Sequence, residues 1–329
     1  MSASGGEARA EEAMADDGHG AIRPREGSTL HYALLWTKPA ARERFLARLA
    51  LIRTLARTLD DVNDPGVAER KVHWWHEELA RLAGGAPRHP RTVACADSLA
   101  GDEAATAALL DVLSVAATTR YTPPSDDLEW HARLARDHGA RLALLAHALG
   151  EAADDLADPA VRHTGLATGL GLHETLSRLP ALLHRGFAVF PDATYRSHGL
   201  NPAALARHVR REGPDGARLG GIPVVTDGSG DTDDANGAVD AKRRAIVAAS
   251  VDAASTALEG ALTDPDHHAA YSREARAPIA RLAALRARKL RLWREQRPDL
   301  LRETVTPTPL AKFLVAWRHR RGARRPRQH

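Results

Sequence analysis

The sequence predicts an all-α protein built as a single helical domain. Apolar residues recur at helical spacing through most of the 329 residues, and no stretch alternates apolar and polar residues as a half-buried strand would. Aromatic residues make up only 4% of the chain, whereas the helix-favouring residues alanine, leucine and arginine are abundant. With 43% hydrophobic and 27% charged residues, the composition is that of a globular chain with a sizeable core.

Helix-start and helix-stop residues divide the chain into successive helices. Pro39 suits the first turn of a helix that places leucines 46, 49, 51, 55 and 59 on its inner side. Pro65 opens a second helix that Gly84 and Gly85 stop, and Pro180 breaks or ends a later one. The remaining helices are expected over residues 89–101, 102–119, 126–157, 161–184, 240–262, 265–297 and 309–321.

Three segments fall outside the helical pattern of the domain, which spans residues 29–320. Residues 1–28 are small, polar and aperiodic, so we expect a disordered N-terminal segment. Residues 213–239 are rich in glycine and aspartate, which predicts a flexible loop between two helical blocks. Residues 321–329 form a basic tail, and six arginines with no acidic residue lie between Arg318 and Arg327.

The basic tail and the composition limit the kinds of partner and the cellular location that we expect for this protein. The tail suits contact with anionic lipid, and a solvated, frayed end is the alternative. No nucleic acid is expected, because no nucleic-acid-binding motif accompanies the arginines. Cys95 is the only cysteine, which excludes an internal disulfide. Without an apolar run of about 18 residues or a secretory signal, we expect a cytoplasmic protein, with membrane association through the tail as the open alternative.

An acidic cluster follows the first long helix. If that helix continued to residue 64, Asp60, Asp61 and Asp64 would lie at i, i+3 and i+4 spacings on one face, where their repulsion would favour a divalent cation. Magnesium binds one or two carboxylates and completes its shell with water and phosphate oxygens, and Arg57 could reach the same phosphates. The alternative is an acidic turn that ends one helix and caps the next through Asp64.

The residues around this cluster resemble the squalene and phytoene synthases, which join two prenyl diphosphates head to head. Arg57, Asp60, Asp61 and Asp64 match the family pattern Arg-x-x-Asp-Asp-x-x-Asp. The segments "VHWWHEEL", His89-Pro90, "FAVFPDATYRSHGLNPAAL" and "PLAKFLVAWR" are similar to later family segments, so the resemblance covers about residues 29–320. It implies an isoprenoid-synthase-like bundle around an apolar central cavity, Mg²⁺ at the three aspartates, and a prenyl diphosphate such as farnesyl diphosphate as ligand.

The second acidic motif of that family has no counterpart here. The matching stretch, residues 169–187, contains no aspartate, and His173 and Leu176 stand where the family has Gln and Asn. Arg178 and Arg185 on this stretch could bind the diphosphate directly, although Arg178 could equally pair with Glu174 at i,i+4. Two functions therefore stay open: a prenyltransferase, or a non-catalytic assembly factor or lipid-binding module on the same fold. The second resembles the mitochondrial complex I assembly-factor branch, which is similarly stripped of aspartates.

Overall fold

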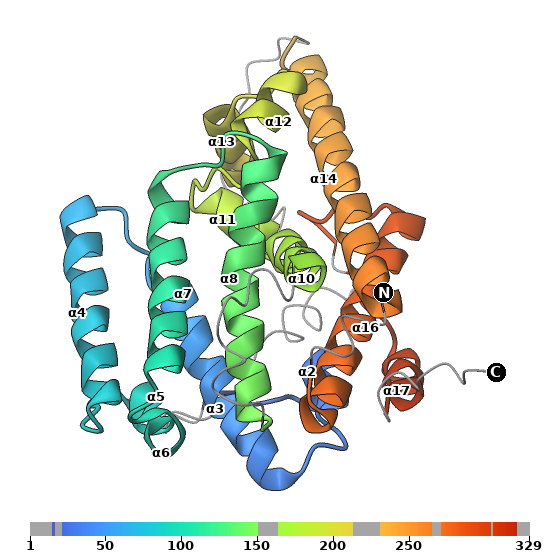
Figure 1. Ribbon diagram of the computed structural model, residues 1–329. Coiled ribbons are helices and arrows are strands. Elements are labelled where there is room, and N and C mark those ends of the chain that lie inside the picture. Colours follow the sequence, from blue (N-terminus) through green and yellow to red (C-terminus); the bar gives the residue numbers. More distant parts are fainter. Residues whose placement is uncertain are drawn as a thin grey trace.

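The computed structural model describes residues 15–16, 22–150, 164–212, 231–264, 271–303 and 305–320. Within them the chain is a bundle of helices with α10 at its centre (Figure 1). Helix α10 packs against α8, α14 and α16, and α3 packs against α7 and α8 on the other side of the bundle. The longer helices are α3 (Pro39–Ala56), α4 (Pro65–Ala83), α7 (Glu103–Tyr121), α8 (Asp127–Ala148), α10 (Thr164–Ser177), α14 (Asp231–Thr263) and α16 (Arg273–Gln296).

Shorter elements connect and cover these helices. They are β1 (Ala15–Asp16), β2 (Ile22–Arg23), α2 (Thr29–Ala33), α5 (Pro90–Val93), α6 (Ala96–Leu99), α11 (Leu179–His184), α12 (Asp192–Ser197), α13 (Pro202–Glu212) and α17 (Pro309–Arg318). The two strands, of two residues each, pair antiparallel. The all-α prediction is therefore confirmed, apart from this minimal strand pair.

Helix starts follow the prolines and capping residues that the sequence offers. Pro39, Pro65 and Pro309 each lie in the first turn of a helix, and Asp126 caps α8 by accepting the N–H of Glu129 at 2.8 Å. The predicted break near Pro180 is also present, because α10 ends at Ser177 and α11 begins at Leu179.

Regular elements begin inside two of the predicted non-helical segments. In the N-terminal one, Ile22 is buried in the strand pair, and Ser28 caps α2 by accepting the N–H of His31 at 3.1 Å. The predicted loop 213–239 ends earlier than expected, because α14 begins at Asp231. Residues 213–230 and the predicted basic tail 321–329 lie outside the described residues.

Helix α14 contains a stretch, Gly237–Thr263, that is long and apolar enough to cross a membrane, although the sequence pattern led us to expect none. It packs against α10 and α16, and its Arg243 is buried in ion pairs with Asp240 and Asp299. These contacts are those of a core helix within the bundle.

Helices α10 and α14 pack closely because α10 has a glycine, Gly169, where it contacts α14. A Cβ atom at Gly169 would lie 2.7 Å from Leu258 Cγ and 3.0 Å from the Leu258 backbone nitrogen. Most residues of α10 are buried, so the helix has no free side toward which it could shift.

Replacing Gly169 with alanine should therefore lower the free energy of unfolding by about 1–3 kcal/mol, because the added methyl group overpacks this contact. Gly260→Ala, in α14 with no atom within 4 Å of the added Cβ, is the matched control. It should leave stability unchanged or raise it by up to about 1 kcal/mol through helix propensity. Urea denaturation measures both, and equal effects would contradict the close approach.

Candidate functional site

The three aspartates predicted to bind metal do not share one helix. Helix α3 ends at Ala56, Asp60 and Asp61 lie in the following turns, and Asp64 has extended backbone angles. The Asp64 carboxylate caps α4 by accepting the N–H of Val67 at 2.8 Å. Pro65 disfavours helical backbone at Asp64, so the chain breaks here and the i, i+3 and i+4 face does not form.

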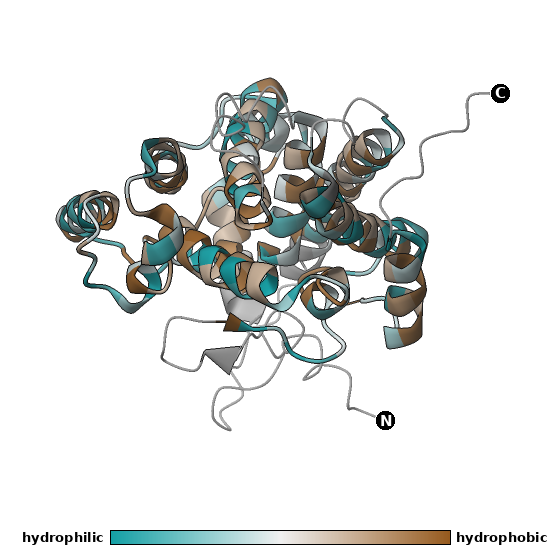
Figure 2. Ribbon diagram, turned by 60° about the horizontal axis from the view of Figure 1, so that its bottom comes forward, coloured by the Kyte–Doolittle hydropathy of each residue, from teal (hydrophilic) through white to brown (hydrophobic). Residues whose placement is uncertain are grey.

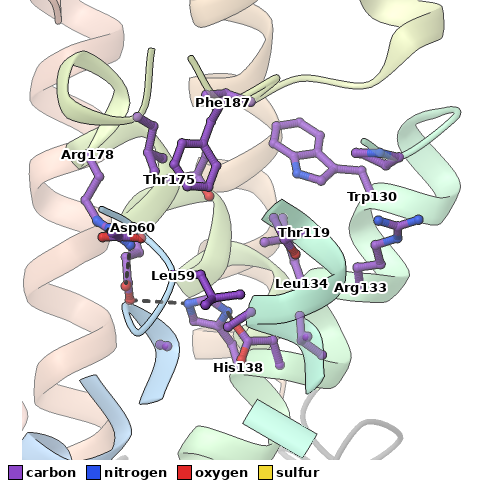
Figure 3. A pocket seen from close by; sticks show the side chains of 18 of the residues that line it. Leu59, Asp60, Thr119, Trp130, Arg133, Leu134, His138, Thr175, Arg178 and Phe187 are labelled. Atoms are coloured by element: carbon purple, nitrogen blue, oxygen red, sulfur yellow. Dashed lines mark hydrogen bonds and ion pairs between the residues drawn. The ribbon is translucent and has the colours of Figure 1, made fainter. Parts of the chain in front are cut away.

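Asp60 is held by two arginines from the opposite side of the bundle. Its side chain is 10% exposed, and it accepts hydrogen bonds from Arg178 and, at 3.2 Å, from Nη1 of Arg185. The second guanidinium nitrogen of Arg185 lies 2.9 Å from Asp61, whose side chain is 78% exposed. These arginines flank α11, so the ion pairs connect the end of α3 to the α10–α11 junction (Figure 3 shows Arg178 directed at Asp60).

This arrangement does not fit a divalent cation. The charge of Asp60 is already balanced by two guanidinium groups, and Asp64 is engaged as a helix cap. Across the part of the chain that the structure describes, no group of three or more His, Cys, Asp or Glu side chains is placed to hold a metal ion. The predicted Mg²⁺ ligands Asp60, Asp61 and Asp64 are therefore not assembled into a metal site.

The predicted diphosphate ligands are brought together only in part. Arg178 and Arg185 meet at Asp60, and Arg178 also forms the predicted i,i+4 ion pair with Glu174, at 4.0 Å. Arg57 is the C-cap residue that follows α3, and its buried Nε atom has no hydrogen-bond partner among the described residues.

A first cavity lies beside Asp60, and we call it the Asp60 cavity. Its volume is about 130 Å³, and its polar wall carries Asp60, Arg178 and His138. Aromatic residues Trp130 and Phe187 line another wall (Figure 3). Among all the lining residues the three arginines are matched by three carboxylates, so this cavity carries no excess charge.

A second cavity, of about 100 Å³, lies between α2, α3, α8, α10 and α16, and we call it the His173 cavity. Leucines, Ile52 and Phe45 form much of its wall. Four basic residues line it against a single carboxylate, that of Glu174; the basic residues are Arg53, Arg141, Arg286 and Lys289. Basic side chains therefore outnumber carboxylates among the residues that line this cavity.

His173 is buried in the wall of this second cavity. Its ring stacks on Trp293 with centroids 5.6 Å apart, and neither ring nitrogen has a hydrogen-bond partner in the described part of the chain. Burial, reinforced by the charges of Arg286 and Lys289, lowers the pKa of His173 well below its usual value. The ring is therefore neutral and presents one donor and one acceptor without a protein partner, which is uncommon for buried polar atoms.

Four ionisable residues separate the two cavities, and we call them the central polar network: Asp137, His138, Arg141 and Glu174. Arg141 Nε donates to Asp137 Oδ1 at 2.9 Å, and Arg141 Nη1 donates to Glu174 Oε1 at 3.3 Å. His138 lies 3.4 Å from the other Glu174 oxygen. Arg141, His138 and Glu174 line both cavities, so the expected single apolar cavity is divided by charged side chains.

Glu174 and Arg141 remain ionised although they are largely buried. Burial alone would raise the pKa of Glu174, but Arg141, with His138 and Arg178, holds it well below its usual range. Burial alone would likewise lower the pKa of Arg141, but the carboxylates of Asp137 and Glu174 raise it. Sequence reasoning missed this network, although the i,i+4 spacing of Asp137 and Arg141 was a signal for it.

Arg141→Met should destabilise the protein by about 3–5 kcal/mol, because it leaves the buried carboxylates of Asp137 and Glu174 without their main cation. The control is Arg136→Met, which removes an arginine paired with Asp111 at the exposed surface of the same helix. That loss should stay under about 1 kcal/mol. Thermal and urea unfolding measure the difference, and similar losses in the two variants would show that the network does not hold the bundle together.

Comparison with known proteins agrees with this architecture. No curated protein sequence matches the chain. A crystal structure of a dehydrosqualene synthase in complex with a ligand superposes with a TM-score of 0.61 at 14% sequence identity, covering 88% of this chain and 90% of that one. The profile of the squalene/phytoene synthase family matches residues 23–308. The chain therefore belongs to the squalene/phytoene synthase family.

Proposed function

We propose that this chain binds an isoprenoid diphosphate, such as farnesyl diphosphate, and holds the diphosphate directly through basic side chains. The observation that carries the proposal is the His173 cavity, whose lining combines four basic residues and one carboxylate with leucines, Ile52 and Phe45. Such a cavity complements a ligand with an anionic head and a hydrocarbon tail. Family membership supports the isoprenoid class, and the ligand-bound dehydrosqualene synthase is a protein of the same fold.

The charge balance favours the His173 cavity over Asp60 as the place for the diphosphate. Arg178 and Arg185, which we predicted as diphosphate ligands together with Arg57, are already paired with Asp60 and Asp61. A diphosphate would have to displace these carboxylates before it could use either arginine. At the His173 cavity, an anionic head group would meet a lining in which four basic residues stand beside one carboxylate.

The cavities must join to admit such a ligand. Each has about 100–130 Å³, whereas pockets for ligands of this class occupy roughly 300–1,000 Å³. The central polar network stands between them, so movement of Arg141 and Glu174 is the step that creates a continuous site. Binding therefore includes a rearrangement of these two side chains.

This chain could be a prenyltransferase or a binding module without turnover. The pairing of Asp60 with arginines favours the binding module. Ionising an allylic diphosphate needs dense positive charge around the departing diphosphate, which metal clusters supply in enzymes of this chemistry. Asp60 is neutralised by arginines, and residues 169–187 contain no aspartate. We therefore expect that the chain binds the diphosphate and releases none.

Calorimetric titration with farnesyl thiodiphosphate, a non-hydrolysable analogue, tests the proposal. Binding should persist in EDTA, and Lys289→Met should weaken it by about tenfold or more, since one charge-assisted contact contributes about 1.5–3 kcal/mol. Arg185→Met, which removes a cation already paired with Asp60 and Asp61, is the matched control and should change affinity little.

Two results would contradict this assignment. Binding that requires Mg²⁺ and is lost in Asp60→Asn would place the head group at a metal held by the aspartates. Diphosphate release from farnesyl diphosphate, measured with and without Mg²⁺, would show turnover and exclude the module without catalysis.

A further inference from the structure

Helix α17 carries its apolar residues on the outside of the molecule. Leu310, Phe313, Leu314 and Trp317 are all 38–68% exposed. Trp36, which follows α2, extends the same patch, since its ring lies 6.1 Å from that of Phe313. These five residues are half of the large hydrophobic side chains that are exposed in the described ranges, and we call them the α17 surface.

The largest apolar side chains of α17 lie on its outer side. Its inner side buries Lys312 and Ala316 and packs Val315 against a small apolar cluster, and Lys312 donates to the backbone oxygen of Gly27 at 3.2 Å. A helix whose only role was to cover the bundle would turn its leucines and aromatic rings inward. The helix lies at the rim of the bundle beside the C-terminus (Figure 1), and hydrophobic colour marks the helix that leads into the C-terminal trace in Figure 2. An apolar surface is therefore presented outward next to the chain end.

Basic residues surround this surface. Arg318 and Arg320 are exposed, and the Arg320 guanidinium lies 5.0 Å from the centre of the Trp317 ring. No aspartate or glutamate occurs in residues 309–329, and four further arginines follow Arg320 in the sequence. Exposed tryptophan, phenylalanine and leucine beside a concentration of arginine are the features of a segment that lies in the interface of an anionic bilayer.

We propose that the α17 surface docks the protein onto an anionic lipid bilayer. With ten residues, α17 is about 15 Å long, half of the roughly 30 Å hydrocarbon core, so it lies in the interface and does not span it. The aromatic rings and leucines enter the headgroup region, and the arginines pair with lipid phosphates.

A second copy of the chain suits this surface less well than lipid does. A symmetric dimer through α17 would bring Arg318 and Arg320 of both copies together without any acidic residue from residues 309–329 to offset them. Charge complementarity therefore favours the anionic lipid surface.

Flotation of the full-length protein with lipid vesicles tests this inference. The protein should float with vesicles of phosphatidylcholine mixed with phosphatidylglycerol, and not with phosphatidylcholine alone. The double variant Phe313→Ser with Trp317→Ser should weaken binding by about tenfold or more, because it removes two interfacial rings. The control double variant, Val93→Ser with Leu128→Ser, removes exposed apolar residues elsewhere and should bind as the unaltered protein does.

Circular dichroism and the unfolding temperature verify that both double variants fold. Absence of flotation with anionic vesicles would overturn the proposal, as would equal binding of the two double variants. The proposal would also be overturned if a chain ending at Arg320 lost binding while the Phe313→Ser, Trp317→Ser variant bound fully. That pair of results would assign docking to the tail alone. A dimer in sedimentation velocity that only the aromatic variant abolishes would identify a second copy as the occupant.

Discussion

The carboxylate of Asp60 constrains the arrangement of the charged side chains around it. It is nearly buried at the end of α3, where an uncompensated charge would cost several kcal/mol. Arg178 and Arg185 neutralise it from the α10–α11 junction, which joins the two sides of the bundle through charge. A metal ion would satisfy the same electrostatic need, so the arginines and a cation are alternative solutions to one problem, and this chain contains the first.

The lining that is richest in basic residues lies in another part of the interior. Arg178 and Arg185 compensate the charges of Asp60 and Asp61, whereas the lining of the His173 cavity contains four basic residues and one carboxylate. His173 adds a neutral ring with no hydrogen-bond partner among the described residues. The central polar network connects the two regions, because Glu174 pairs with Arg141 at 3.3 Å and with Arg178 at 4.0 Å, and Arg178 pairs with Asp60. The ion pairs of the core are therefore parts of one electrostatic system.

The helices could be predicted from local chemistry, and the site could not. Pro39 and Pro65 mark helix starts because their fixed φ suits a first turn. Residues 213–239 predict a loop because glycine and aspartate are frequent there, yet helix α14 begins within this stretch, at Asp231. The three aspartates followed a family pattern, but local pattern does not show that α3 ends at Ala56 and that Asp64 becomes a cap. The His173 cavity could not be predicted from the sequence, because only the tertiary fold brings Arg53 and Lys289 to the wall of one cavity.

A manganese soak of crystals of the ligand-free protein tests most directly whether Asp60 is compensated by arginine. The anomalous difference map would locate Mn²⁺, which binds the same oxygen ligands as Mg²⁺. We expect no anomalous peak within coordination distance of the carboxylates of Asp60 and Asp61, with Arg178 and Arg185 remaining in place. A strong peak bridging these carboxylates, with the two guanidinium groups displaced, would contradict it.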